Sequence, residues 1–243
     1  MKKGCLIIHG LTGTPATVSF LRQAFLEAGF IISVPCLAGH GSTPDELSRT
    51  SWQDWYETIR ISYGALRKET DRVFCAGISL GALLAMKLAV DEGWGIRAMA
   101  LMATPLELPF YQRCAAHVVK YSPLRFVIKN VSKDYEKSVA DENGRLLYEQ
   151  MSFSKIPVNA VFEIQKLQRE VLGNLEKISN PTLLLHGRHD KVVKPSNIDL
   201  FAAKASSSVI EVKIFDNSRH VLTMDSEKKE VAETIVEFFG KFS

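Results

Sequence analysis

Long apolar runs, paired cysteines and a large net charge are all missing from this 243-residue sequence. No apolar stretch approaches the roughly 18 residues that a membrane-spanning helix needs, so no transmembrane segment is expected. The formal net charge is only +3 and no block of lysine and arginine stands out, so the composition does not indicate a nucleic-acid partner. A hydrophobic fraction of 46% and a charged fraction of 23% are typical of a globular protein with a sizeable core.

The cysteines are few and form no CxxC pair: Cys5, Cys36, Cys75 and Cys114. Cys5 and Cys75 lie in apolar runs typical of central strands, which favours reduced, buried thiols over disulfides. The apolar run after the N-terminal lysines is too short for a signal peptide. We therefore expect a cytoplasmic protein. The sequence gives no indication of its oligomeric state.

Nucleotide and zinc motifs are also absent. There is no GxGxxG or GxxxxGK[ST] segment, and the spacing of histidines and acids matches no helical zinc motif. No cofactor or metal is expected.

Short apolar runs alternate with helical patterns along most of the chain. This alternation predicts βαβ units in an α/β fold, with a mostly parallel sheet flanked by helices. The predicted strands are residues 6–9, 30–34, 72–76, 96–103, 182–186 and 209–214. The predicted helices are residues 18–28, 51–68, 80–90 and a C-terminal segment around 231–239.

Residues 106–174 break this rhythm, because they show helical patterns and no predicted strand. A helical insert between two strands predicts a small cap at about residues 106–158 within a single domain of residues 1–243. Apolar side chains of the insert are candidates for lining a substrate pocket, or for packing the cap on the sheet. They are Phe110, Tyr111, Phe126, Val127, Ile128 and Phe153.

A GxSxG segment, residues 77–81, stands between the strand 72–76 and the buried helix that begins at Leu80. A sharp strand-to-helix turn strains its central residue and requires small neighbours, which explains the two glycines. Such a turn lifts the Ser79 hydroxyl above the sheet edge, beside a helix N-terminus that favours negative charge. The alternative is a tight turn in which the serine has no catalytic role. The position of the segment between a strand and a helix disfavours this alternative.

A serine nucleophile needs a base and an orienting carboxylate. His220 follows the last predicted strand and therefore lies at the same sheet edge as Ser79. Asp190 follows the strand before it and gives the chain order serine, aspartate, histidine. Asp216 and Asp225 are alternative acids. The other histidines are expected to be structural or loop residues, although His40 could approach the site: His9, His40, His117, His186 and His189.

Two backbone N–H groups are expected to stabilise an oxyanion. Leu80, the residue after the serine, supplies one. Leu11 is the candidate for the other, because the loop after the first strand carries Gly10 and Gly13, which let its backbone approach a substrate.

Four segments together resemble the compact bacterial carboxylesterases and monoacylglycerol lipases of the α/β-hydrolase superfamily. They are residues 6–15, 38–41 and 77–81, together with the pair formed by 189–190 and 218–225. The resemblance implies an α/β-hydrolase fold, Ser79, Asp190 and His220 as catalytic triad, and Leu11 and Leu80 as oxyanion donors. Leu11 stands where those enzymes more often have phenylalanine, and Arg219 where a small or uncharged residue is common.

The residues and the resemblance predict a serine-dependent carboxylesterase that hydrolyses small-molecule acyl esters of short to medium chain length. A monoacylglycerol lipase and a thioesterase are alternatives on the same fold. A third alternative is a relative that binds a ligand without catalysing a reaction. Such a protein would lack a triad residue or have a blocked oxyanion loop, and this sequence shows neither change.

Overall fold

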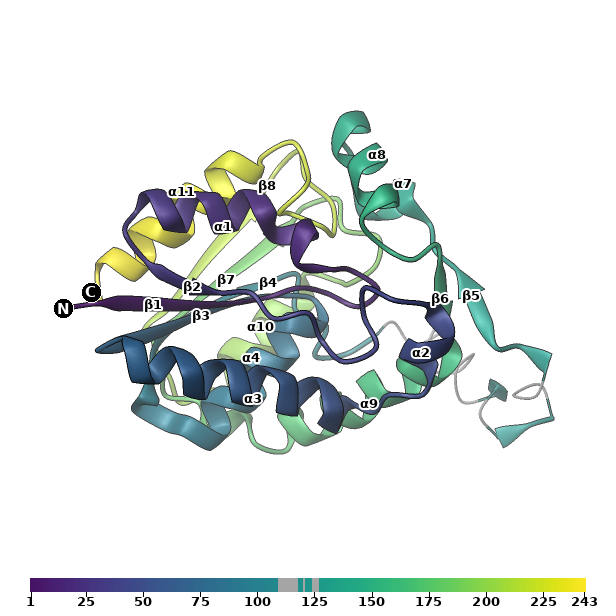
Figure 1. Cartoon of the computed structure of the whole chain (residues 1–243), viewed down its shortest axis with the longest axis horizontal. Helices are drawn as coiled ribbons and strands as arrows, with labels where there is room; N and C mark the ends of the chain where they lie inside the picture. Colours follow the sequence, from purple (N-terminus) through teal and green to yellow (C-terminus); the bar gives the residue numbers. More distant parts are fainter. Residues whose placement is uncertain (109–117, 120, 124–126) are drawn as a thin grey trace.

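A single parallel sheet forms the centre of the molecule. The computed structural model describes residues 1–108, 118–119, 121–123 and 127–243. The strand order is β2-β1-β3-β4-β7-β8, and each neighbouring pair is parallel (Figure 1). The strands are β1 (Lys3–Ile8), β2 (Ile31–Ser33), β3 (Arg72–Ile78), β4 (Ile96–Met102), β7 (Thr182–Gly187) and β8 (Ile210–Phe215). The predicted fold class is thus confirmed, with strand ends that differ by one to a few residues.

Helices cover both faces of the sheet (Figure 1). One face carries α1 (Ser19–Glu27), preceded by η1 (Pro15–Val18), and α11 (Lys228–Gly240). The other carries α3 (Trp52–Glu69), α4 (Leu80–Glu92), η2 (Gly93–Gly95), α9 (Val158–Leu172), η3 (Leu175–Lys177) and α10 (Ser196–Lys204), with the short α2 (Pro44–Ser48) near α9. The start of α3 is fixed by a capping box in which Ser51 and Asp54 satisfy each other's backbone N–H groups.

Each face of the sheet has its own apolar core. The central strands are buried on both faces, which is why the sequences of β1 and β4 are nearly continuous apolar runs.

The thiols of Cys5, Cys36 and Cys75 are free, and burial raises the pKa of Cys75 to about 12. Cys114 lies outside the described residues. Among the described residues, no helix is long and apolar enough to cross a membrane.

Residues 127–157 are the later part of the predicted insert and are called the insert from here on. They lie beyond the carboxyl ends of the sheet strands (Figure 1). They contain α7 (Tyr135–Ser138) and α8 (Glu142–Gln150), and also β5 (Asn130–Ser132) and β6 (Lys155–Pro157), which pair antiparallel. The prediction that residues 106–174 hold no strand was therefore wrong. Strands of three residues are too short to show an alternating pattern in the sequence. Phe110, Tyr111, His117 and Phe126 lie outside the described residues.

The approach of α4 to β1 gives a stability prediction. A methyl group at Gly81 would overlap the carbonyl oxygen of Ile8, whereas one at Gly64 on α3 would meet nothing within 4 Å. Gly81→Ala should lower the free energy of unfolding by about 1–3 kcal/mol through overpacking. Gly64→Ala should raise it by about 0.5–1 kcal/mol, because alanine restricts the unfolded chain and favours helix. Denaturant unfolding of both variants measures this difference, and equal effects would contradict it.

Candidate active site

Ser79 lies at the junction of β3 and α4 in a strained backbone conformation, with φ +54° and ψ −116°. Its N–H donates to the carbonyl of Met102 over 2.9 Å, which ties the turn to β4. Two residues before and two residues after the serine there is no room for a side chain. A methyl group at Gly77 would overlap the carbonyl oxygen of Gly81, and one at Gly81 would overlap that of Ile8. Positive φ in a non-glycine residue is costly and is concentrated at functional sites. The strand-to-helix turn predicted from the GxSxG segment is therefore present.

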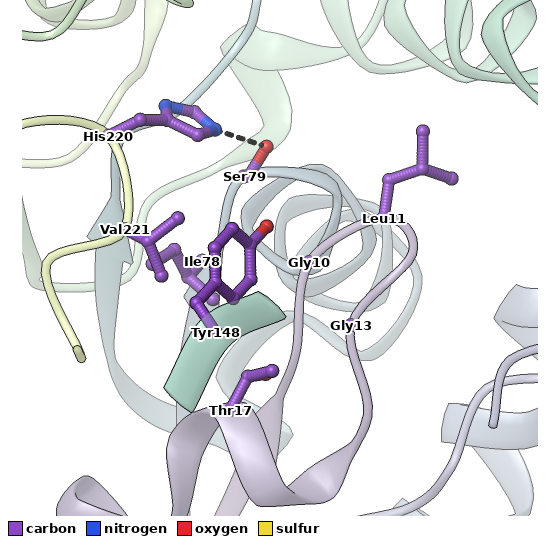
Figure 2. Close-up of a pocket in the computed structure, with 9 residues that line it drawn as sticks. All are labelled: Gly10, Leu11, Gly13, Thr17, Ile78, Ser79, Tyr148, His220 and Val221. Atoms are coloured by element: carbon purple, nitrogen blue, oxygen red, sulfur yellow. Dashed lines mark hydrogen bonds between the residues drawn. The ribbon is translucent and has the colours of Figure 1, made fainter. Parts of the chain in front are cut away.

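His220 joins Ser79 and Asp190 into one hydrogen-bonded series. Figure 2 shows its bond to Ser79. Its Nδ1 lies 2.8 Å from Oδ2 of Asp190, and its Nε2 lies 3.0 Å from Oγ of Ser79. When Nδ1 carries the proton and donates it to the carboxylate, Nε2 is free to accept from the serine hydroxyl. The His220 side chain is 9% exposed, so water competes little for either ring nitrogen.

The Asp190 carboxylate is fully buried and fully engaged. Its Oδ1 accepts from the backbone N–H groups of Val192 and Val193 at 2.7 and 2.9 Å. Its Oδ2 faces both His220 and His186, the latter at 3.2 Å. Burial alone would raise the pKa of Asp190, but the nearby His220 and these hydrogen bonds outweigh it and hold the pKa well below the usual range. The carboxylate thus stays ionised while it orients the imidazole.

The two alternative acids have other partners. Asp216 is exposed and forms an ion pair with Arg188 at 2.5 Å. Asp225 is buried, and its carboxylate accepts from the backbone N–H groups of Ala140, Asp141 and Arg219 at 2.8–3.0 Å. Asp225 therefore joins the loop that carries His220 to the insert.

Arg219 adds a second connection between that loop and the insert. Its guanidinium donates to the carbonyls of Glu136 and Val139. The side chain is therefore held against the insert, while the neighbouring His220 is bonded to Ser79.

The loop after β1 turns sharply beside the serine. The N–H of Gly13 donates to the carbonyl of Gly10 over 3.1 Å, and Thr12 has φ +62°. Gly10, Leu11 and Ser79 line a common small pocket with His220 (Figure 2). Leu80 is the first residue of α4, so its N–H has no carbonyl one turn earlier to bond. The two residues predicted as oxyanion donors thus come from segments that meet at this pocket.

The other described histidines lie beside backbone carbonyls or at the surface. His9 is completely buried, accepts from the N–H of Leu37 and lies 2.9 Å from the carbonyl of Gly10, as expected of a structural residue. His40 packs against His9, and burial together with that neighbour lowers its pKa to about 3. His186 lies 3.1 Å from the carbonyl of Val193, and His189 is an exposed loop residue.

A larger pocket of about 440 Å³ opens beside the serine and is mostly apolar. Ser79, Leu11, Thr12 and His220 line it together with residues of the insert. The insert contributes Val131 and Ile156, and also two residues that no sequence pattern indicated, Lys133 and Tyr148. The predicted pocket residues Val127, Ile128 and Phe153 are not among those lining it, although Phe153 donates from its N–H to the carbonyl of Thr12.

No sequence signal singled out Lys133 or Tyr148, because both lie in a segment that matched no motif. Burial lowers the pKa of Lys133 to about 6, and burial raises that of Tyr148. Lys133 follows β5 (Asn130–Ser132), an exposed strand with two polar residues, so nothing in the local sequence predicted that its side chain would be buried.

Comparison with known proteins agrees with this geometry. The profile of the family described as serine aminopeptidase, S33 (Hydrolase_4) matches residues 1–227. The chain is 27% identical over 238 residues to the thermostable monoacylglycerol lipase of Bacillus sp. (strain H-257), covering 98% of this chain and 90% of the relative. It is 26% identical over 240 residues to a carboxylesterase of Bacillus subtilis (strain 168), with 98% and 93% covered.

Among solved structures, the chain is similar to one from a study of LipS and LipT, two metagenome-derived lipolytic enzymes. The TM-score is 0.88 at 26% identity, and the alignment covers 99% of this chain and 94% of that structure. The parallel sheet, the strand-to-helix turn at Ser79 and the extent of the profile match lead to one conclusion. This chain belongs to the serine aminopeptidase, S33 family, within the α/β-hydrolase superfamily.

Proposed function

We propose that this serine hydrolase is a carboxylesterase that uses Ser79, His220 and Asp190 as its catalytic triad. The observation that carries the proposal is the hydrogen-bonded series from Asp190 through His220 to Ser79, which ends at an apolar pocket. Serine is a weak nucleophile until a base removes its proton, and this series supplies a base with a fixed orientation. A relative without activity would not require the strained backbone that presents Ser79.

The reaction begins when Oγ of Ser79 attacks the ester carbonyl and its proton passes to Nε2 of His220. The backbone N–H groups of Leu11 and Leu80 donate to the resulting oxyanion. His220 then gives the proton to the departing alcohol oxygen, which leaves an acyl group on Ser79. A water molecule, deprotonated by His220, releases the acid and restores the serine. Asp190 stabilises the imidazolium in both halves.

The substrate class follows from the pocket and the relatives. A pocket of about 440 Å³ with mostly apolar walls suits a short- to medium-chain acyl ester. We propose that the segment 106–158 acts as a cap that shapes this pocket. The buried, free thiols of Cys5 and Cys75 support the cytoplasmic location that we also propose.

A monoacylglycerol lipase is the second candidate, and one observation favours it. Polar groups gather on the pocket wall at Thr12, Ser132 and Ser138, where they could bond glycerol hydroxyls. The monoacylglycerol lipase relative matches nearly the whole chain, as does the carboxylesterase.

Removal of the nucleophile tests the reaction. Ser79→Ala should lower kcat for p-nitrophenyl esters by at least about 10³-fold, because no other group can form the acyl-enzyme. Ser62→Ala on α3, away from the site, should leave kcat unchanged. The measurement is the initial rate of hydrolysis of p-nitrophenyl esters from acetate to palmitate, together with 1-monoacylglycerols and acyl thioesters. A peak at short or medium p-nitrophenyl esters supports the carboxylesterase, and a strong preference for monoacylglycerols supports the lipase.

Exchange of the acid tests its role. Asp190→Asn should lower kcat by about 10³–10⁴-fold, because the amide no longer fixes the imidazole tautomer. Asp216→Asn removes an equivalent charge at the surface and should retain nearly full activity. Similar losses in the two variants would contradict the assignment.

Acid unfolding gives an independent measurement on the same pair. The pKa of Asp190 is depressed below its ordinary value of 3.8, so the stability it contributes is present above that pH and is lost as the pH falls below it. The stability difference between wild type and Asp190→Asn should therefore shrink as the pH falls below 3.8. Denaturant unfolding at several pH values measures it, and a constant difference would contradict the ionised, stabilising carboxylate.

A further inference from the structure

Lys133 reaches from the insert into the pocket that contains Ser79. It follows β5, and its backbone N–H donates to the carbonyl of Ser154 over 2.9 Å. Its ammonium donates to Oγ1 of Thr12 at 2.9 Å and to Oγ of Ser152 at 2.8 Å. An ammonium has three N–H donors, so these hydroxyls leave one for another acceptor. Lys133 lines the pocket together with Ser79 and His220.

The ammonium is buried against aromatic rings. Nζ lies 3.8 Å from the ring centre of Tyr148 and 5.1 Å from that of Tyr135. Both rings present a face of negative potential, which favours a cation. Burial acts in the opposite direction and lowers the pKa of Lys133 to about 6, so without an anion beside it the amine is mostly uncharged at neutral pH. An anion bound at this amine would favour the charged form, and Lys133 would then take up a proton.

A counter-ion is missing from this arrangement. Within the described part of the chain, no carboxylate lies within 4.0 Å of the Lys133 ammonium, unlike those of Lys137 and Lys87, which pair with acids at 2.8 and 2.7 Å. The acidic residue that lines the pocket is Asp134, and it is the partner of Lys137. Lys191 also lines the pocket. Among the described residues that line it, basic side chains therefore outnumber acidic ones.

We propose that Lys133 recognises an anionic group, a carboxylate or a phosphate, on the ester substrate. The inference rests on the proposed esterase function and adds to it the class of substrate. Burying a cation without a counter-ion is costly, and a bound anion would reduce that cost by accepting the remaining N–H. The apolar walls accommodate the chain between the ester carbonyl at Ser79 and the anion at Lys133.

A purely structural role for Lys133 would need no charge. The loop after β1 is already joined to the insert by the N–H of Phe153, which donates to the carbonyl of Thr12 over 3.0 Å. A glutamine at position 133 could still donate to a hydroxyl, whereas it could not neutralise an anion. The variants Lys133→Met and Lys133→Gln therefore distinguish a structural role, which needs only hydrogen bonds, from recognition of an anion, which needs a positive charge.

Two matched pairs of esters test the proposal at neutral pH. In the first, 4-nitrophenyl hydrogen suberate is compared with its methyl ester, which places a carboxylate on the acyl part. In the second, 1-octanoylglycerol 3-phosphate is compared with 1-octanoylglycerol, which places a phosphate on the alcohol part. The quantity is the ratio of kcat/KM for the anionic ester to that for the neutral one. Because both esters use the same triad, general damage to the site cancels in this ratio.

Wild type should prefer the anionic member of at least one pair by about 10- to 100-fold, the range expected for a hydrogen bond between charged groups. Both Lys133→Met and Lys133→Gln should lose that preference. Lys229→Met removes an exposed charge from α11 and should retain it. The pair that shows the effect identifies carboxylate or phosphate as the group recognised.

Ratios that stay within about twofold of wild type in both variants, on both pairs, would overturn the proposal. Equal losses of kcat/KM on the anionic and the neutral esters would overturn it as well, since they would show that Lys133 only holds Thr12 in position. If folded wild type hydrolyses none of the four esters, or Ser79→Ala retains the activity, the proposed esterase function itself fails. Thermal unfolding of each variant establishes that it is folded.

Discussion

The backbone of α4 meets that of β1 at Gly81, with no room for a side chain between the helix and the carbonyl oxygen of Ile8. This contact fixes where the helix begins relative to the sheet. The chain must then turn within a single residue, which forces Ser79 to a positive φ and exposes its hydroxyl above the sheet edge. The same contact places the first N–H of α4 beside the loop that follows β1. The position of the proposed nucleophile and the positions of its proposed oxyanion donors are thus set by one interaction.

The imidazole is located by a second, separate set of contacts. A methyl group at Gly187 would overlap the carbonyl of Arg219, so β7 and the His220 loop are in direct backbone contact. Asp190 extends from the end of β7, and its backbone hydrogen bonds to Val192 and Val193 hold the carboxylate rigid. Asp225 fastens the other side of the loop. His220 therefore has little freedom other than rotation of its ring, and hydrogen bonds at both nitrogens restrict that rotation.

Much of the sheet and its site could be predicted because the relevant signals are local. The GxSxG segment dictates its own turn, and the apolar runs of β1, β3, β4 and β7 mark buried parallel strands. Asp190 and His220 could be placed only through chain order and the shared sheet edge. The role of Asp225 was not predictable, because its partners Ala140 and Asp141 are distant in the sequence. The short strands β5 and β6 and the burial of Lys133 likewise depend on tertiary contacts that no sequence pattern records.

Only part of the insert is hydrogen-bonded to the loop that carries His220, so substitutions in its different parts have different consequences. Near residues 140–141 the backbone is bonded to Asp225, so a change there also displaces the loop that carries His220. The antiparallel pair of β5 and β6 has no such bond to that loop among the described residues, although it supplies pocket wall at Val131 and Ile156. Substitutions at these two positions can therefore alter which molecules fit while the contacts of His220 stay intact. A lineage can drift to new substrates through these two strands without displacing the loop that carries His220.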